Sequence, residues 1–403
     1  MAAPVYIAPH AWRPADTLAG VRSGLRRGNS GKGKTEQQAR VSGLCEALER
    51  YSGIFRGDEP RRTARYEELG EAAIHPADCL LFSEAQYRDR EAWNASHSGF
   101  NHVPAPFDAE QAIEWTPVWS LRQQRARYVP TAFGYYGYPL PEAHRFCGAD
   151  SNGSAAGNTV EETILQGFLE LVERDSVALW WYNRVQRPWV DLGGVDEPYF
   201  QAFAAYYAQR GREVWVLDLT SDLSIPVFAA VSRCTDGSGE KLLFGFGAHV
   251  EARIGIERAL TEMTQGLGYF ARVEPSDESE DDADRREALE WWQTATLAEQ
   301  SYLAPSPELP VQTAADYPRL WSADLREDVE WCVSLAAQRG LETLVLDQTR
   351  PDIGLSVVKV IMPGMRHFWR RLAPGRLYDV PVELGWLSTP LREDELNPIS
   401  MFL

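Results

Sequence analysis

Three segments of the chain repeat one pattern of polar and apolar residues. Residues 42–50 read SGLCEALER, residues 166–174 read QGFLELVER, and a looser copy at residues 258–265 reads RALTEMTQ. Each copy has polar side chains at positions i, i+4 and i+7, which form one narrow stripe on an α-helix. The polar positions are Ser42, Glu46 and Glu49, then Gln166, Glu170 and Glu173, then Arg258, Glu262 and Gln265. The repeat therefore predicts three helices with matching polar stripes.

The glutamates of the first two stripes are expected to be partly enclosed, because the neighbouring positions are largely apolar. Carboxylates that share an enclosed site repel one another and lose their hydration. A hard cation relieves both costs, and Mg²⁺ binds carboxylates while keeping positions for phosphate oxygens. Three stripes facing one cavity would therefore form a nucleotide–magnesium site. The alternative readings are solvated helix faces or a duplicated helix pair with a purely structural role.

A glycine-rich segment precedes the first predicted helix. Residues 28–35 read GNSGKGKT and match the pattern GxxxxGK[ST]. A phosphate-binding P-loop must connect a buried strand to a helix. Residues 18–27 have three basic residues and two glycines where that apolar strand is required. We therefore rank a P-loop NTPase below a different loop geometry, in which Lys32 or Lys34 contacts phosphate.

Composition and charge argue against several classes of protein. The net charge of −18 argues against a general nucleic-acid binder, which needs positive charge to displace phosphate counterions. The chain has no run of eighteen apolar residues, so we expect no membrane-spanning helix. The first eleven residues lack the features of a signal peptide, which predicts a cytoplasmic protein. The five cysteines are dispersed, which argues against a zinc knuckle or a disulfide framework.

Helix and strand patterns alternate along the whole chain, which predicts an α+β fold with mixed sheets flanked by helices. We expect a glycine-rich loop at residues 28–35, a turn-rich stretch at 150–158 and a proline-rich tail from residue 372. Helices are expected at residues 36–55, 159–183, 199–210, 252–269, 285–298 and 324–339, and strands at 115–138, 214–219, 226–232, 242–246, 343–347 and 356–362. The expected parts are an N-terminal arm (1–20), a core (21–273), an acidic solvated loop (274–284) and a C-terminal lobe of the same domain (285–403).

The segments around the three stripes resemble the signatures of the YcaO family. GKGKTEQQARVSGLCEALERYSG is similar to the first signature, DSNGSAAGNTVEETILQGFLELVERD to the second and IERALTEMTQG to the third. All three occur in order, and the similarity in character extends over most of the chain. The resemblance implies a YcaO-like ATP-binding fold and an enzyme that uses ATP to activate a backbone amide of a peptide.

The resemblance also implies roles for individual residues. The residues implied to hold Mg²⁺ ions that bridge the phosphates of ATP, and so to serve catalysis, are Glu46, Glu49, Glu170 and Glu173. The residues implied to contact the nucleotide or to order these ligands are Lys32, Ser42, Arg50, Asn158, Gln166, Arg258, Glu262 and Gln265.

The family's azoline-forming cyclodehydratases act on precursor peptides of ribosomal natural products. A Cys, Ser or Thr side chain of the substrate attacks the preceding carbonyl, the oxyanion takes the γ-phosphoryl group of ATP, and phosphate departs to leave an azoline ring. Such a reaction requires positioning and charge neutralisation but no nucleophile from the enzyme. No Ser-His-Asp or Cys-His arrangement stands out in this sequence.

The C-terminal tail departs from the pattern of many azoline-forming relatives, which end in Pro-x-Pro-x-Pro. This chain ends LNPISMFL and has only Pro398 in that stretch, which would otherwise be interpreted as an ordinary hydrophobic tail packed on the surface. Because Pro381 and Pro390 still mark the tail, we favour azoline formation. Thioamide or amidine formation by the same activation step is an alternative, as is a non-catalytic scaffold subunit of a maturation complex.

The expected partners follow from the resemblance and from the short segment before the first motif. We expect a ribosomal precursor peptide as substrate and a separate E1-like or leader-peptide-binding protein that presents it. A homodimer is left open, and neither nucleic acid nor membrane is expected as a partner.

Overall fold

The computed structural model describes residues 3–9, 28–97, 99–141, 145–194, 198–270 and 283–402. Most of the predicted arm and of the predicted acidic loop therefore lies outside the described residues. The helices are α2 (Glu36–Ser52), α3 (Tyr66–Leu69), α4 (Pro76–Leu80), α5 (Glu84–Arg88), α6 (Arg90–Ser96), α7 (Thr131–Gly134), α8 (Val160–Asn183), α9 (Pro198–Ala208), α10 (Ala252–Phe270), α11 (Ala283–Thr294), α12 (Leu325–Gln338) and α13 (Arg376–Glu383). The strands are β1 (Val5–Pro9), β2 (Gly28–Lys32), β3 (Arg62–Ala64), β4 (Ile113–Ser120), β5 (Arg125–Pro130), β6 (Ser154–Gly157), β7 (Arg212–Asp218), β8 (Val227–Cys234), β9 (Leu243–Ala248), β10 (Leu344–Asp347) and β11 (Ser356–Ile361).

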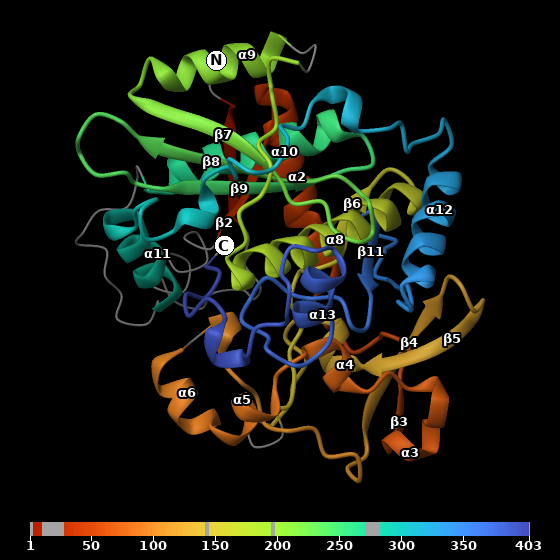
Figure 1. Cartoon of the computed structure of the whole chain (residues 1–403). Coiled ribbons are helices and arrows are strands. Elements are labelled where there is room, and N and C mark those ends of the chain that lie inside the picture. The colour runs from red at the N-terminus through yellow and green to blue at the C-terminus, as the bar shows by residue number, and fades with distance from the viewer. Residues whose placement is uncertain are drawn as a thin grey trace, which may run out of the picture.

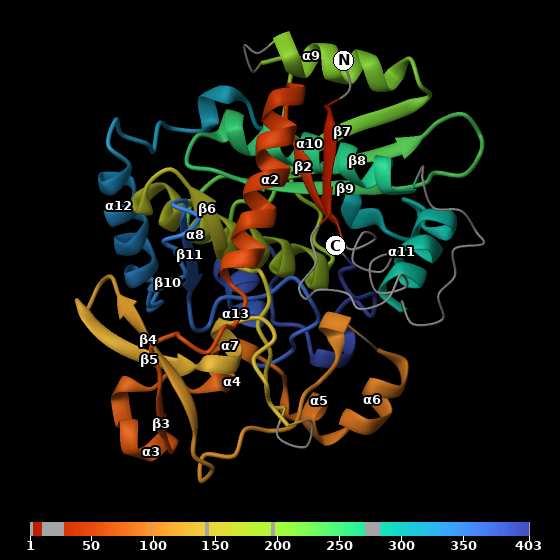
Figure 2. The same cartoon turned by 180° about the vertical axis from the view of Figure 1, so that it is seen from behind.

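The described strands form three antiparallel sheets (Figures 1 and 2). β1 pairs with β2, and β7, β8 and β9 form a second sheet in that order. The third sheet has the order β3-β4-β10-β11-β6, with β5 also paired to β4. Strands β10 and β11 of the predicted C-terminal lobe thus complete a sheet begun by the predicted core, which is consistent with one domain. The predicted α+β class is confirmed.

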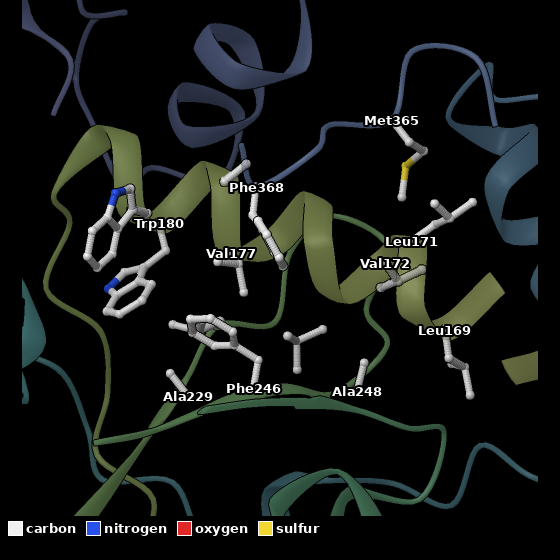
Figure 3. Packing of buried hydrophobic residues seen from close by; sticks show 14 of the residues in the cluster. Leu169, Leu171, Val172, Val177, Trp180, Ala229, Phe246, Ala248, Met365 and Phe368 are labelled. Carbon is white, nitrogen blue, oxygen red and sulfur yellow. The ribbon is translucent and has the colours of Figure 1, made fainter. Parts of the chain in front are cut away.

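Helix α8 runs through the middle of the molecule (Figure 1). It begins after Thr159, whose hydroxyl accepts a hydrogen bond from the N–H of Glu162 and caps the first turn. Val177 and Trp180 lie toward Phe246 and Ala229 of the three-stranded sheet, while Met365 and Phe368 lie on the other side of the helix (Figure 3). Apolar contacts on both sides therefore hold α8, and with it the second polar stripe, in a fixed orientation.

The three repeat helices are confirmed as α2, α8 and α10, within three residues of the predicted ends. Their origin as one duplicated unit stays a prediction. None of the described helices combines the length and apolar character that a membrane-spanning helix requires. All five cysteines are free thiols.

Two predictions of irregular structure were wrong because partners distant in sequence complete short strands. The glycine-rich segment contains β2, which pairs with β1 from Val5↔Lys32 to Pro9↔Gly28. The turn-rich stretch contains β6, which pairs with β11. Neither strand carries an apolar or β-branched run, so local sequence gave no signal for it.

The region after residue 372 is more ordered and more buried than its prolines suggest. It contains α13, with Pro381 inside the helix. Leu396, Asn397 and Met401 are all buried, and the N–H of Asn397 donates to the carbonyl oxygen of Tyr182 at the end of α8. The last residues therefore pack against the end of α8.

Strand β2 lies directly on helix α2, and Gly31 permits this contact. A Cβ atom at Gly31 would lie 2.0 Å from the carbonyl oxygen of Ala39 and 2.2 Å from the nitrogen of Gly43. We expect Gly31→Ala to lower the free energy of unfolding by about 1–3 kcal/mol, because backbone atoms must move apart. Gly268→Ala is the control, since a Cβ there meets open space within α10. Urea denaturation measures both variants, and an equal effect of the two would contradict this packing.

Candidate active site

Strand β2 joins the polar stripes of α2 and α10. The N–H of Ser30 donates to Glu46 Oε2 at 3.1 Å, and the carbonyl oxygen of Ser30 accepts from Gln265 Nε2 at 2.6 Å. At the end of the strand, Lys32 Nζ forms an ion pair with Glu262 of α10. Ser30 therefore bonds to both α2 and α10, and Lys32 contributes a positive charge to the stripe of α10.

Arg258 joins the stripes of α8 and α10. Its Nη2 atom donates to Gln166 Oε1 at 2.5 Å, and its Nη1 atom donates to the carbonyl oxygen of Ala248 at the end of β9. This bond connects the first polar position of the third stripe with the first polar position of the second. The three stripes consequently meet, as the sequence predicted.

Two arginines hold the glutamates of the first two stripes. Arg50 Nη2 lies 3.5 Å from Glu46 Oε1, and Arg50 Nη1 lies 3.7 Å from Glu49 Oε1. On α8, Arg174 Nη2 lies 3.1 Å from Glu170 Oε1, and Arg174 Nη1 lies 2.7 Å from Glu173 Oε1. Each arginine follows its second glutamate directly in the sequence, so the two helices repeat one arrangement.

Sequence reasoning missed three residues that touch this site. Arg174 occupies the same position of the repeat as Arg50, so the alignment of the two copies could have indicated it. Tyr136, whose hydroxyl accepts from Arg50 Nη1 at 2.9 Å, comes from the segment after α7. Gly153 donates its N–H to Glu170 Oε2 at 3.0 Å. The last two come from other parts of the chain and leave no local signal.

Burial and mutual repulsion raise the pKa of two glutamates. Burial raises the pKa of Glu49 to about 8, with Arg50 opposing the shift and the Glu170 carboxylate adding to it. Burial likewise raises the pKa of Glu173 to about 7, with Arg174 opposing it and Glu262 adding to it. The side chains of Glu49 and Glu173 are only 14% and 11% exposed. Carboxylates on all three helices therefore act on one another, which supports one shared site.

Glu262 behaves differently from these two glutamates. Burial alone would raise its pKa, but the positive charges of Lys32 and Arg174 outweigh this effect and hold the pKa below its ordinary value. The N–H of Phe246 also donates to Glu262 Oε1 at 3.3 Å. Glu262 is thus an ionised carboxylate fixed between β2, β9 and α8.

Asn158 and Ser42 were predicted to contact the nucleotide. Among the described residues, neither forms a hydrogen bond to another predicted site residue. Asn158 is exposed just before α8, and its N–H and side-chain amide both donate to Glu162 Oε2, at 2.8 and 3.0 Å. Ser42 lies half-buried on α2, one turn before Glu46. Their roles stay predictions.

The chemistry of the donor set fits a hard cation, although basic side chains hold the carboxylates in this structure. In the part of the chain that the structure describes, no three His, Cys, Asp or Glu side chains are grouped closely enough to hold a metal ion. Five carboxylates from three helices nevertheless lie around this site, and burial raises the pKa of Glu49 and Glu173, so a bound cation would favour their ionised forms. Mg²⁺ prefers such oxygen ligands.

The glycine-rich segment does not form a P-loop. Residues 28–32 are the strand β2, which pairs with β1 and therefore does not have the loop geometry of a P-loop. The helix begins only at Glu36, after the N-cap residue Thr35. Lys34 Nζ lies 2.9 Å from Glu257 Oε2, outside the set of predicted glutamates.

A comparison with protein families identifies the relatives of this chain. The model of the family described as YcaO cyclodehydratase, ATP- and Mg²⁺-binding, matches residues 30–366. This chain belongs to the YcaO family. The predicted family and fold are thereby confirmed, and so are ATP and Mg²⁺ as the predicted cofactors. The YcaO match contains all three stripes.

Two solved structures and one further protein are similar to this chain. A heterocyclase in complex with substrate and cofactor is 55% identical, with a TM-score of 0.93 over 99% of this chain and 53% of its own. The heterocyclase TruD is 52% identical, with a TM-score of 0.83 over 96% of this chain and 54% of its own. An uncharacterised protein of Methanothermobacter thermautotrophicus is 28% identical over 84% of this chain and 82% of its own length. This YcaO chain spans about half the length of the two heterocyclases.

The raised pKa values predict a pH dependence of stability. We expect the metal-free protein to lose stability between about pH 5 and pH 8, where unfolded glutamates have lost their protons. Folded Glu173 keeps its proton until about pH 7 and folded Glu49 until about pH 8. The folded state therefore binds more protons than the unfolded state, so the free energy of unfolding falls as the pH rises.

Guanidinium denaturation at several pH values, with a chelator present, measures this fall. Glu49→Gln removes one of the two titrating carboxyl groups, so its stability should fall less steeply with pH than that of the wild-type protein. Identical slopes for the two proteins would contradict the assignment.

Proposed function

We propose that this chain is an ATP-dependent peptide cyclodehydratase. It phosphorylates a backbone amide oxygen and forms thiazoline or oxazoline rings from Cys, Ser or Thr of a ribosomally made precursor peptide. The observation that carries the proposal is the meeting of the three stripes: Ser30 bonds to Glu46 of α2 and Gln265 of α10, and Arg258 of α10 bonds to Gln166 of α8. Two heterocyclases that are more than half identical to this chain support the same reaction class.

The substrate supplies its own nucleophile in this reaction. Its side-chain oxygen or sulfur adds to the preceding carbonyl carbon and loses its proton, which leaves an oxyanion on the former amide oxygen. Bound Mg²⁺–ATP supplies the γ-phosphoryl group that turns this oxygen into a leaving group. Departure of inorganic phosphate and loss of the amide proton then leave the C=N bond of the ring. The enzyme contributes positioning and charge neutralisation.

The residues of the site fit these tasks. The residues that would hold the metal are Glu46, Glu49, Glu170 and Glu173. Lys32 and Arg258 bring positive charge to the third stripe, where they can neutralise phosphate oxygens. Arg50 and Arg174 would keep the carboxylates in place, since each contacts two of them.

We further propose that a separate E1-like or leader-peptide-binding protein presents the substrate. In the two heterocyclases, about half of the chain lies outside the part that matches this protein. The net charge of −18 would complement a basic partner or peptide. Thioamide or amidine formation would use the same ATP site with another nucleophile.

An isotope experiment tests the proposed activation step. A precursor peptide with ¹⁸O in the backbone carbonyl that precedes a modified residue is incubated with this chain, its partner and Mg²⁺–ATP. We expect the label in inorganic phosphate, because the amide oxygen leaves on the phosphoryl group. Label in water, or ring formation without ADP, would contradict the proposal, whereas a scaffold subunit would neither bind ATP nor transfer label.

A further inference from the structure

Lys359 is a buried cation in β11, which lies between β10 and β6 in the largest sheet. It lies opposite Ser154 of β6 and is 2% exposed. A buried lysine is costly unless hydrogen-bonding partners satisfy its charge. Lys359 Nζ donates to the carbonyl oxygens of Asp150 and Asn152 at 2.8 and 3.0 Å and lies 3.4 Å from Asp150 Oδ1. All three of its donors are therefore directed at one turn, residues 150–153.

This turn is held tightly between β11 and α8. Gly153 has a φ of +77°, and a Cβ there would lie 2.1 Å from the carbonyl oxygen of Val360. The N–H of Val360 donates to the carbonyl oxygen of Gly153 at 2.7 Å. On the other side, a Cβ at Gly167 of α8 would lie 2.4 Å from that same oxygen. The turn thus touches strand and helix without a side chain in between.

The last residue of the turn, Gly153, contacts Glu170, one of the proposed metal ligands. The N–H of Gly153 donates to Glu170 Oε2 at 3.0 Å, while Glu170 Oε1 accepts from Arg174. The orientation of the Glu170 carboxylate consequently depends on where the turn places this N–H. Partners of this kind fix the orientation of ligands in metal sites.

We propose that Lys359 is a positioning residue for the metal site: its ammonium group holds the turn at residues 150–153, and the Gly153 N–H of that turn orients Glu170. Lys359 does not touch the metal, the nucleotide or the substrate in this scheme. The inference rests on the proposed function, because it takes Glu170 as a metal ligand.

Binding of Mn²⁺, followed by electron paramagnetic resonance with a non-hydrolysable ATP analogue present, tests this inference without measuring turnover. Mn²⁺ accepts the same oxygen ligands as Mg²⁺. We expect Lys359→Met to weaken Mn²⁺ binding about tenfold, the scale on which such supporting contacts act. Lys359→Arg keeps a charged donor and should recover most of the affinity, which a general loss of packing would not allow.

Arg212→Met is the matched control. Arg212 in β7 is 6% exposed and also donates to backbone carbonyls, those of Ser232 and Lys241, in another sheet. The Arg212→Met variant should lose thermal stability and keep the wild-type affinity for Mn²⁺. If Lys359→Met does not fold, Asp150→Ala is measured in its place. This variant removes only the Asp150 carboxylate and keeps the two carbonyl oxygens that accept from Lys359, so it should weaken Mn²⁺ binding about threefold.

Two results would overturn the inference. One is wild-type Mn²⁺ affinity in folded Lys359→Met, or in Asp150→Ala where it replaces that variant. The other is an equal loss of affinity in Arg212→Met. A wild-type protein that binds no Mn²⁺ with the analogue would instead overturn the proposed metal site itself, and the inference with it.

Discussion

Glu173→Gln is expected to reduce ATP-dependent modification of the precursor peptide by about 100-fold or more, because the metal contribution to catalysis is worth several kcal/mol. Glutamine keeps the size of the side chain but removes the negative charge that would bind Mg²⁺. The side chain lies between Arg174 and Glu262, at the meeting of α8 and α10. Glu46→Gln on α2 should have a comparable effect, since the same site uses both helices.

Glu36→Gln is the control for this prediction. Glu36 lies in the first turn of α2, on the same helix as Glu46, but its side chain is 81% exposed. The control should retain wild-type activity. Phosphate release and peptide mass measure turnover, and circular dichroism checks that each variant is folded. Wild-type activity in both Glu46→Gln and Glu173→Gln would contradict the assignment of the site.

Lys32→Met is expected to weaken binding of Mg²⁺–ATP by about 10- to 100-fold, as a hydrogen bond between charged groups contributes roughly 1.5–3 kcal/mol. Lys32 lies at the end of β2 and pairs with Glu262, so its ammonium group belongs to the third stripe. Lys34→Met should have a smaller effect, because Lys34 pairs with Glu257 instead.

Calorimetric titration with ATP and Mg²⁺ distinguishes these two lysines. A P-loop enzyme requires the lysine that precedes Thr35, which is Lys34. A large loss in Lys34→Met together with a small loss in Lys32→Met would therefore favour a P-loop and contradict the site described above.

The three repeat helices were predictable because each carries its own signal. In α2, α8 and α10, the polar stripe and the apolar flanks recur at helical spacing. Thr35 and Thr159 mark the start of the first two of these helices as N-caps, so their first residues were predicted to within one position.

Strands β2 and β6 were not predictable, because their partners lie far away in the sequence. β2 pairs with β1, across residues that the structure does not describe, and β6 pairs with β11 about 200 residues later. Within the site, the sequence indicated which stripes would meet. It could not indicate that Gly153 bonds to Glu170 or that Tyr136 bonds to Arg50, since these contacts depend on the arrangement of the sheets.

We propose that this chain activates a backbone amide with ATP to form azoline rings. Intact-mass spectrometry of a co-expressed candidate precursor peptide, with and without this chain and its partner, tests that claim most directly. We expect the loss of one water per modified residue with the wild-type chain and no change with Glu173→Gln. Exchange of oxygen for sulfur would place the chain in the thioamide-forming alternative. An unchanged peptide mass, with the partner present and ATP bound, would contradict the claim.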